Sequence, residues 1–228
     1  RRKRGNRGHR SRMPSWWSLG LWPSWRNAAR LAVGVEGVGI AERAYQGALA
    51  YALDRRQGRS VWTGEASSPI FDHPDVRRSL AVMKAKISAA RAICLLTGVA
   101  ADMAEHAADE TDRRRWKARE DLFTPIAKAW STDVGCEVAS MGVQVHGGMG
   151  YIEETGAAQF FRDARITPIY EGTNGIQAAD LVGRKLSLSN GAAFATLIED
   201  LRGAAHPALG ELVAAPDVGE EGEGHGDR

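Results

Sequence analysis

The chain has 228 residues, of which 43% are hydrophobic and 25% charged, as in an ordinary globular protein rather than a disordered or fibrous one. Its 30 basic and 28 acidic residues give a net charge of +2, and its two cysteines and six histidines lack ligand spacing, which argues against a disulfide framework and a metal site. No stretch of about 18 apolar residues is evident, so we expect no segment that spans a membrane.

Residues 1–30 differ in composition from the rest of the chain. They hold nine Lys or Arg and four of the seven Trp but no acid, so residues 31–228 carry 21 basic and 28 acidic residues, a net charge of −7. Such a leader is typical of a targeting segment, or of one that binds a membrane surface or nucleic acid. Because it lacks helical periodicity, we expect 1–30 to be a disordered arm. The acidic body makes nucleic acid an unfavoured partner.

Apolar residues three and four positions apart predict helices over most of the remaining chain. These helices are expected at 31–56, from Pro74 to about residue 108, at 122–143, at 176–188 and at 193–201. The many alanines of the first helix allow close packing against a neighbour. Residues 109–121 are expected to form a charged connector or a short helical turn, and 144–175 a Gly-rich irregular stretch.

Long helices joined by short loops predict an all-α fold, an antiparallel up-and-down helix bundle at 31–205. The acidic, Gly-rich residues 206–228 predict a solvated tail. The stretch 144–175 is the one long irregular segment inside the expected bundle. Because long loops within compact domains are often functional, we expect the site there.

Glu171 is the acid that this stretch singles out. It lies between Tyr170 and Gly172, directly before the turn and cap formers Thr173 and Asn174. One interpretation is an acid near the start of a capped helix, where the helix dipole favours a negative charge. The other is a carboxylate that a tight turn aims into a site.

Three sequence runs lie in order within 34 residues. They are Gln-x-x-Gly-Gly-x-Gly-Tyr at 144–151, Arg-Asp-Ala-Arg-Ile at 162–166 and Ile-Tyr-Glu-Gly-Thr-x-x-Ile-Gln at 169–177. Together they resemble the C-terminal signature of the acyl-CoA dehydrogenases, flavoproteins that desaturate acyl-CoA thioesters. The resemblance covers roughly residues 30–190, and "YEGTNGIQAADLVGRK" is most similar to the branch that includes 3-methylmercaptopropionyl-CoA dehydrogenase.

The resemblance implies an FAD-dependent reaction with Glu171 as the catalytic base. The base would remove a proton from the carbon next to the thioester carbonyl while FAD accepts a hydride from the next carbon. The backbone N–H of Glu171 and a hydroxyl of FAD would polarise the carbonyl, with Tyr170 and Gly172 beside the substrate. Glu171 is then expected to be dry, in a cleft between the helices and the Gly147–Gly148 loop.

The resemblance also implies the cofactor contacts. Arg55 matches an arginine that pairs with an FAD phosphate across a subunit boundary, although a charge at a helix end is the simpler interpretation. Thr173 matches a residue that bonds the flavin, with Asn174 and Gly175 next to it. The run that holds the adenosine half of FAD in a neighbouring subunit comprises Gln144, Val145, His146, Gly147 and Gly148.

The partners implied by the resemblance are an acyl-CoA substrate, an electron-transfer flavoprotein as acceptor and further copies in a homodimer or homotetramer. The expected location is a bacterial cytoplasm or the mitochondrial matrix. The family's N-terminal and middle domains have no counterpart here, so we expect an inactive fragment with weak FAD binding. Two alternatives remain open: a non-catalytic helical binding module whose basic arm binds nucleic acid or membrane, and a flavoprotein oxidase of similar fold.

Overall fold

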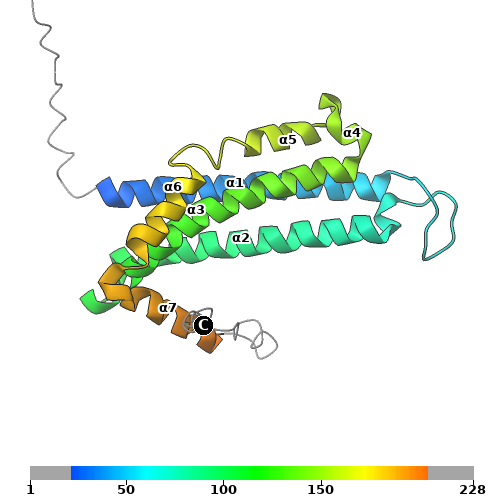
Figure 1. Ribbon diagram of the computed structural model, residues 1–228. Helices are drawn as coiled ribbons and strands as arrows, with labels where there is room; N and C mark the ends of the chain where they lie inside the picture. Colours follow the sequence, from blue (N-terminus) through cyan, green and yellow to red (C-terminus); the bar gives the residue numbers. More distant parts are fainter. Residues whose placement is uncertain (1–21, 205–228) are drawn as a thin grey trace, which may run out of the picture.

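Three long helices form the centre of the fold. The computed structural model describes residues 22–204, in which α2 (Pro74–His106) runs antiparallel to both α1 (Trp22–Asp54) and α3 (Glu110–His146) (Figure 1). In this range no β-strand forms, and a single β-bridge joins Arg56 to Pro69. The expected all-α, up-and-down bundle is confirmed.

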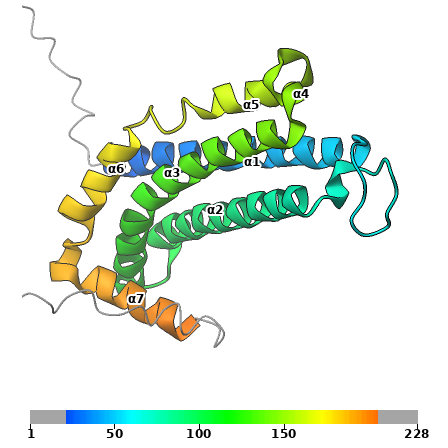
Figure 2. The same cartoon turned by 45° about the vertical axis from the view of Figure 1, so that its right-hand side comes forward.

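Shorter elements cover one side and one end of the long helices (Figure 2). α5 (Ala157–Ala164) packs on α1 and α3, whereas α6 (Asn174–Asp180) packs on α3 and continues into the π-helix η4 (Leu181–Lys185). α7 (Ala192–Ala204) also contacts α3. The connecting elements are η2 (Ile70–Asp72), α4 (Gly148–Tyr151), η3 (Glu153–Thr155) and η5 (Leu188–Gly191).

The core lies between the facing sides of the three long helices. Its fully buried residues include Ala41, Ala48, Met83, Ile87 and Val138. α1 and α3 approach until their backbones touch, because a Cβ added to Gly37 would lie 2.7 Å from the carbonyl oxygen of Ser131. The close packing expected from the Ala-rich first helix is therefore present.

α1 begins at Trp22, nine residues before the expected start. Its first turns are held by tertiary contacts: the Asn27 amide donates to the carboxylates of Glu120 at 3.0 Å and Asp121 at 2.9 Å. A helix that is held by polar contacts shows no apolar periodicity in its sequence. The expectation of a disordered arm at 1–30 is therefore wrong for residues 22–30, which are helical. Residues 1–21 of that arm and the tail at 206–228 lie outside the described residues.

The other boundaries differ for local reasons. α3 begins at Glu110, so the charged residues 110–121 are helical, and the Asp109 side chain caps this helix by accepting a hydrogen bond from the N–H of Asp112 at 2.8 Å. The stretch 144–175, expected to be irregular, contains α4, η3 and α5. After η4 the left-handed residues Ser189 and Asn190 separate this segment from α7.

α2 corrects the expectation that no stretch is apolar enough to cross a membrane. Among the described helices, this one has a length and composition that would allow a crossing. It packs on α1 and α3 through one face, and its Lys86 pairs with Glu137 of α3, as in a bundle helix. The apolar residues Leu95, Leu96, Val99 and Met103 of its C-terminal half are exposed. That the protein does not span a membrane remains a prediction.

Candidate active site

Glu171 lies in the loop that joins α5 to α6. Its φ of 54° is in the left-handed region that residues other than glycine seldom adopt, and Gly172 follows with a φ of 86°. The Glu171 side chain is exposed, and among the described residues its backbone N–H has no hydrogen-bond acceptor. This turn therefore presents a carboxylate and an unpaired N–H group at the surface of the chain.

α6 begins directly after this turn because Thr173 caps it. The Thr173 hydroxyl accepts a hydrogen bond from the N–H of Ile176 at 3.4 Å. The N–H of Asn174 donates to the carbonyl of Pro168 at 3.0 Å, which closes the loop on itself. Glu171 is thus both an acid close to a capped helix start and a carboxylate placed by a tight turn.

Gln177 supports the turn from below. Its side chain is fully buried, and its Nε2 donates to the carbonyls of Gly172 at 3.1 Å and of Glu171 at 3.4 Å. A Cβ on Gly172 would lie 2.8 Å from this nitrogen, so the positive φ and the close contact both require glycine. The carbonyls of the turn therefore point into the protein.

Tyr170 ties the turn to α1. Its hydroxyl donates a hydrogen bond to the carboxylate of Glu36. Partial burial, this hydrogen bond and the negative charges of Glu36 and Glu171 raise the pKa of Tyr170 to about 12. Tyr170 was expected beside the substrate, and the structure gives its hydroxyl a partner on α1.

Asn174 turns its side chain into the protein rather than toward a cofactor. The amide accepts a hydrogen bond from Lys128 Nζ at 2.9 Å and donates to Asp133 at 2.8 Å and to the Thr132 hydroxyl at 3.0 Å. Lys128 is fully buried on α3, and this burial lowers its pKa against the opposing charges of Asp133 and Glu171. The amide of Asn174 is therefore occupied within the protein, and the cofactor contact expected at this residue stays a prediction.

A buried ion pair joins α1 to α6 next to this network. Arg30 lies 2.8 Å from the carboxylate of Asp180, and Arg184 pairs with the same carboxylate. Burial raises the pKa of Asp180, but hydrogen bonds from Arg184 and Arg30 outweigh it, so that this pKa lies below its ordinary value. The α6 segment is thus held to α1 as well as to α3.

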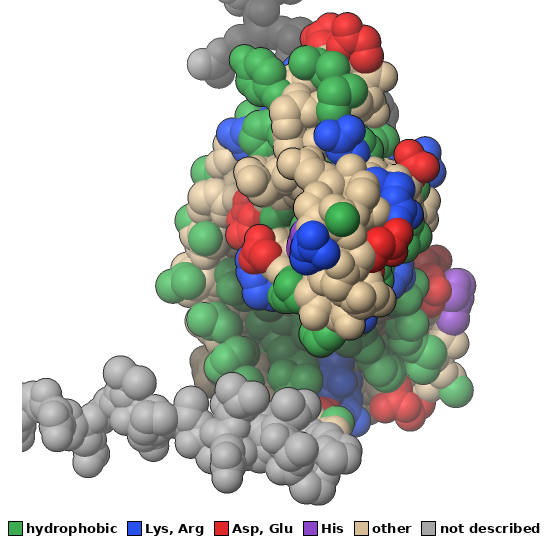
Figure 3. All heavy atoms as spheres, turned by 90° about the vertical axis from the view of Figure 1, so that its right-hand side faces the viewer, with side chains coloured by type: hydrophobic (Ala, Val, Ile, Leu, Met, Phe, Trp, Pro, Cys, Tyr) green, Lys and Arg blue, Asp and Glu red, His purple; other side chains and the backbone are tan. Residues whose placement is uncertain are grey.

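A second group of predicted residues lies at the other end of α3. Because α1 ends at Asp54 and α3 ends at His146, Arg55 and the 144–148 run share this end, which Figure 3 shows with charged and hydrophobic side chains interspersed. His146 is buried, with its ring centroid 4.5 Å from that of Tyr51 and its Nδ1 2.7 Å from the Gly142 carbonyl oxygen. Exposed residues here are Arg55, Gln144, Gly147 and Gly148, whereas Val145 is buried.

Local backbone contacts build the turn at this end. Gly147 adopts φ 60° and ψ −140°, and its N–H donates to the carbonyl of Gln144 at 3.0 Å. Gly150 donates in turn to the carbonyl of Gly147 at 2.9 Å. The Gly-rich run therefore forms a tight turn that ends α3 and begins α4.

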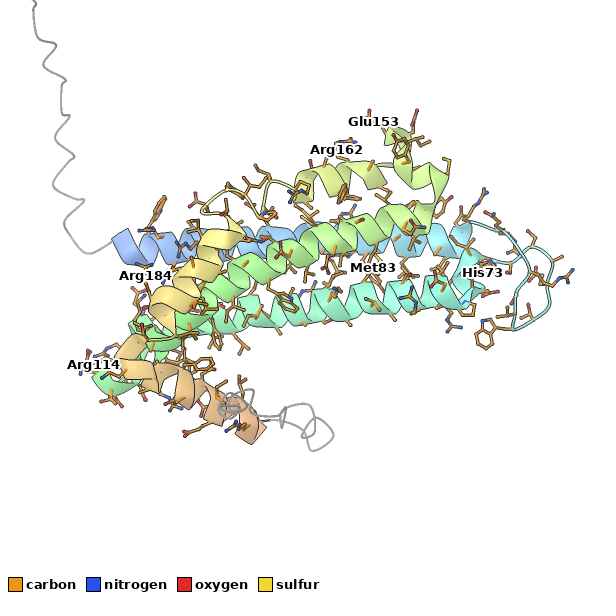
Figure 4. The ribbon with its side chains drawn as sticks, viewed as in Figure 1. His73, Met83, Arg114, Glu153, Arg162 and Arg184 are labelled. Carbon is orange, nitrogen blue, oxygen red and sulfur yellow. The ribbon has the colours of Figure 1, made fainter. Side chains whose placement is uncertain are left out.

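The structure separates the two groups of predicted residues. Asn174 contacts α3 as far along as Asp133, and Gly147 caps the same helix 14 residues later, about 21 Å along its axis. Figure 4 shows this spread, with Arg184 near α6 and Glu153 and Arg162 at the opposite end. The expected cleft between Glu171 and the Gly147–Gly148 loop, and a dry Glu171, are wrong for these residues, because α5 and the loop after it run back along α3.

Sequence reasoning missed the residues that hold the turn, namely Lys128, Gln177, Glu36 and Asp180. Lys128 lies four residues from Thr124 and from Thr132, and the structure buries all three on one face of α3, although polar residues at this spacing do not by themselves predict burial. Gln177 is the last residue of the run at 169–177, which the sequence analysis singled out. No signal near Glu36 indicated its distant partner Tyr170.

Among the described residues, no three His, Cys, Asp or Glu side chains lie close enough together to hold a metal ion. Cys94 is buried with its sulfur 3.3 Å from the Ser131 hydroxyl, and burial raises the pKa of its thiol. That the protein binds no metal remains a prediction.

The sequence of this chain is similar to those of known proteins. Residues 26–186 match the family model described as acyl-CoA dehydrogenase, C-terminal domain. A 3-methylmercaptopropionyl-CoA dehydrogenase of Ruegeria pomeroyi is 53% identical over 165 residues, which are 72% of this chain and 28% of that protein. The chain spans about 28% of the length of curated relatives that it matches.

Two solved structures show the same arrangement of helices. Butyryl-CoA dehydrogenase from Megasphaera elsdenii gives a TM-score of 0.54 at 30% identity, over 71% of this chain and 37% of that one. A chain in a structure of the electron transferring flavoprotein of Acidaminococcus fermentans gives a TM-score of 0.55 at 29% identity, over 69% of this chain and 36% of that one.

Proposed function

The chain belongs to the acyl-CoA dehydrogenase family, whose C-terminal domain it contains, and we propose that it carries the catalytic base of an FAD-dependent acyl-CoA dehydrogenase. The family is one of flavoproteins that act on the CH–CH group of their donors. Because the chain spans about 28% of its curated relatives, the activity is proposed for the whole protein. The helices described at residues 22–204, which include most of the bundle expected at 31–205, are its helical domain in this proposal.

The observation that carries the proposal is the turn at Glu171. One left-handed residue presents both a carboxylate and an N–H group that has no acceptor among the described residues. Desaturation of a thioester needs a base for the α-proton and a donor for the carbonyl oxygen, close together. A single residue supplies both, and Gly172 leaves room for the substrate to approach the backbone.

The proposed chemistry assigns each group a task. The Glu171 carboxylate takes the proton from the carbon beside the thioester carbonyl, and the N–H of the same residue donates to the carbonyl oxygen as negative charge grows there. FAD, when bound, accepts the hydride from the next carbon. Exposure of Glu171 in this chain is consistent with a cover that comes from parts of the whole protein beyond these residues.

The residues present fit an FAD shared between copies. The exposed Arg55 and the exposed Gly147–Gly148 turn suit a diphosphate at one end of the bundle, and the exposed Thr173 suits a flavin at the other. Because about 21 Å of α3 separates the two groups, we propose that they serve two different FAD molecules in a homodimer or homotetramer.

The partners follow from the same proposal. An acyl-CoA thioester is the proposed substrate class, in line with the names of the similar dehydrogenases. An electron-transfer flavoprotein is the proposed acceptor, since a similar chain occurs in a structure of such a protein. A bacterial cytoplasm or the mitochondrial matrix is the proposed location, on the resemblance alone.

The test is a hybrid enzyme in which residues 26–186 replace the aligned segment of the 53% identical dehydrogenase. We expect the hybrid to bind FAD and to lose flavin absorbance when its acyl-CoA is added without an acceptor. Glu171→Gln should slow this reduction by about 10²- to 10⁴-fold, the usual contribution of a positioned base. Glu153→Gln is the matched control, because Glu153 is an exposed acid at the far end of the bundle, and it should leave the rate unchanged.

A hybrid that binds FAD and is reduced equally fast with Glu171→Gln would contradict the assignment of the base. A hybrid that binds FAD but is not reduced by acyl-CoA would favour the non-catalytic helical module. The isolated 228-residue chain should bind FAD weakly, and stoichiometric binding by it would contradict the proposed dependence on the rest of the protein.

A further inference from the structure

Lys128 is a buried charge that the proposed chemistry does not use. Its residue is fully buried on α3, and among the described residues no carboxylate lies within ion-pair distance of its Nζ. Its contact is a hydrogen bond of 2.9 Å to Oδ1 of Asn174. Because an ammonium without an ion-pair partner is costly to bury, a role beyond packing is indicated.

The ammonium group of Lys128 contributes to the orientation of the Asn174 amide, together with the acceptors on α3 that face the amide NH₂ group. A lysine ammonium can only donate, so it selects the oxygen of the amide and turns the NH₂ group the other way. The two hydrogens of that NH₂ group then face three acceptors of α3, one hydrogen being shared: the Ala129 carbonyl at 3.0 Å, the Thr132 hydroxyl at 3.0 Å and the Asp133 carboxylate at 2.8 Å. Lys128 thereby joins the first residue of α6 firmly to α3.

The Glu171 turn depends on this attachment. The N–H of Asn174 closes the loop by donating to Pro168 at 3.0 Å, and Gln177 of α6 holds the carbonyls of Glu171 and Gly172. A left-handed glutamate is strained and persists only where its surroundings hold it on several sides. If α6 shifted from α3, the support of Glu171 would move with it.

We propose that Lys128 is a positioning residue for Glu171, which orients Asn174 and so holds the turn that presents the base. The catalytic meaning of this role rests on the function proposed for Glu171. The structural coupling does not, because it concerns the opening of the loop in the chain itself. The charged groups that act on Lys128 come from three elements: Asp133 on α3, Arg30 on α1 and Glu171 in the loop.

The test is native-state hydrogen exchange of the 228-residue chain, followed by NMR without flavin or acyl-CoA. Lys128→Met keeps the length and apolar stem of the side chain but removes the donor. We expect the amides of Asn174 and Gln177 to exchange about tenfold faster, the effect of losing one ordinary hydrogen bond on a local opening. Amides in the middle of α2 should exchange as before, and the stability of the whole chain should not fall, because removing a buried charge relieves its desolvation.

Lys117→Met is the matched control, since it makes the same change on the same helix at a partly exposed lysine that pairs with Glu120. It should leave the exchange of both amides unchanged. Loop amides that exchange equally in Lys128→Met and in the unmodified chain would overturn the proposal. So would an acceleration that spreads evenly to α2, because it would show a general loss of packing.

A second variant tests whether Lys128 acts through Asn174. With Asn174→Leu the amide of Gln177 should also exchange faster, and adding Lys128→Met should bring no further acceleration, because both changes break one chain of contacts. Additive effects would overturn the proposed route. The exchange experiments do not measure catalysis, so their outcome is independent of the outcome of Glu171→Gln in the hybrid enzyme. The proposed role of Lys128 can fail while the proposed function holds, and the reverse is also possible.

Discussion

The two ends of α3 are held in different ways, although both carry residues predicted to serve one reaction. At the Glu171 end, α1 and α3 touch through their backbones, and buried polar side chains attach α6 to both helices. At the Gly147 end the helices are further apart, since a Cβ on Gly142 would lie 3.4 Å from the Ala44 carbonyl oxygen. There the turn is built from hydrogen bonds between near neighbours in the sequence.

The difference follows from what each end is proposed to do. A base must be held to a fraction of an ångström, and contacts from several distant segments provide this precision for Glu171. A tight turn that lets a phosphate approach the exposed backbone of Gly147 and Gly148 needs only local geometry, which hydrogen bonds between near neighbours supply. The Glu171 end should therefore respond to substitutions far away in the sequence, and the Gly147 end to nearby ones.

The largest effect is expected where the backbones of α1 and α3 touch. Gly37→Ala places a Cβ 2.7 Å from the Ser131 oxygen and 2.9 Å from Thr132 Cα, so the helices must separate. We expect a loss of about 3 kcal/mol in the free energy of unfolding, at the upper end for an overpacked core. The measurement is urea unfolding followed by far-UV circular dichroism.

Gly142→Ala is the control at the looser end of the same interface. With 3.4 Å of space, its cost should be within about 1 kcal/mol of zero, since alanine also favours the helix. Equal losses for Gly37→Ala and Gly142→Ala would show that the two ends are packed alike.

A smaller effect is expected at the turn near Gly147. Gly150→Ala would bring a Cβ against the Val143 carbonyl oxygen and 2.8 Å from the Cβ of His146, whereas Gly148→Ala would meet nothing within 4 Å. We expect about 2 kcal/mol of destabilisation for the first and almost none for the second, measured by the same urea unfolding. Exchange of the Gln177 amide, at the other end, should change only as much as global stability does. A larger change there would show that the two ends are coupled.

The smallest effect is a titration at the Glu171 end. Of the four tyrosines in the sequence, Tyr170 should ionise at about pH 12. Because the folded pKa is raised, the stability from the Tyr170 hydrogen bond is complete below pH 10 and is lost as pH rises through about 12. The measurement is tyrosinate absorbance against pH.

Glu36→Gln should move the pKa of Tyr170 part of the way back toward 10, since burial remains while the charge of Glu36 is removed. Tyr151→Phe is the matched control and should leave the late ionisation in place. An unchanged late ionisation in Glu36→Gln would refute the link between the turn and α1.

Local pattern predicted most of the fold. The second helix, expected from Pro74 to about 108, is observed at Pro74–His106, since its apolar period and its first-turn proline are visible in the residues themselves. The start of α1 was missed because Asn27 and Arg30 are polar residues whose partners, Glu120 and Asp180, are distant in the sequence. The charged residues 109–121 were expected to form a connector or a short helical turn, and not the first turns of the long helix α3, which begins at Glu110.

The sequence by itself determined the helical bundle, the Gly-rich turn after α3 and the cap that starts α6, because each depends on the conformational preferences of neighbouring residues. Only the tertiary structure decided where Glu171 lies: away from the Gly147–Gly148 turn, exposed, and held through Lys128, Gln177 and Glu36. The physical reason is that hydrogen bonds between distant segments form only after the helices have packed. A local pattern records which groups are available and not which of them will meet.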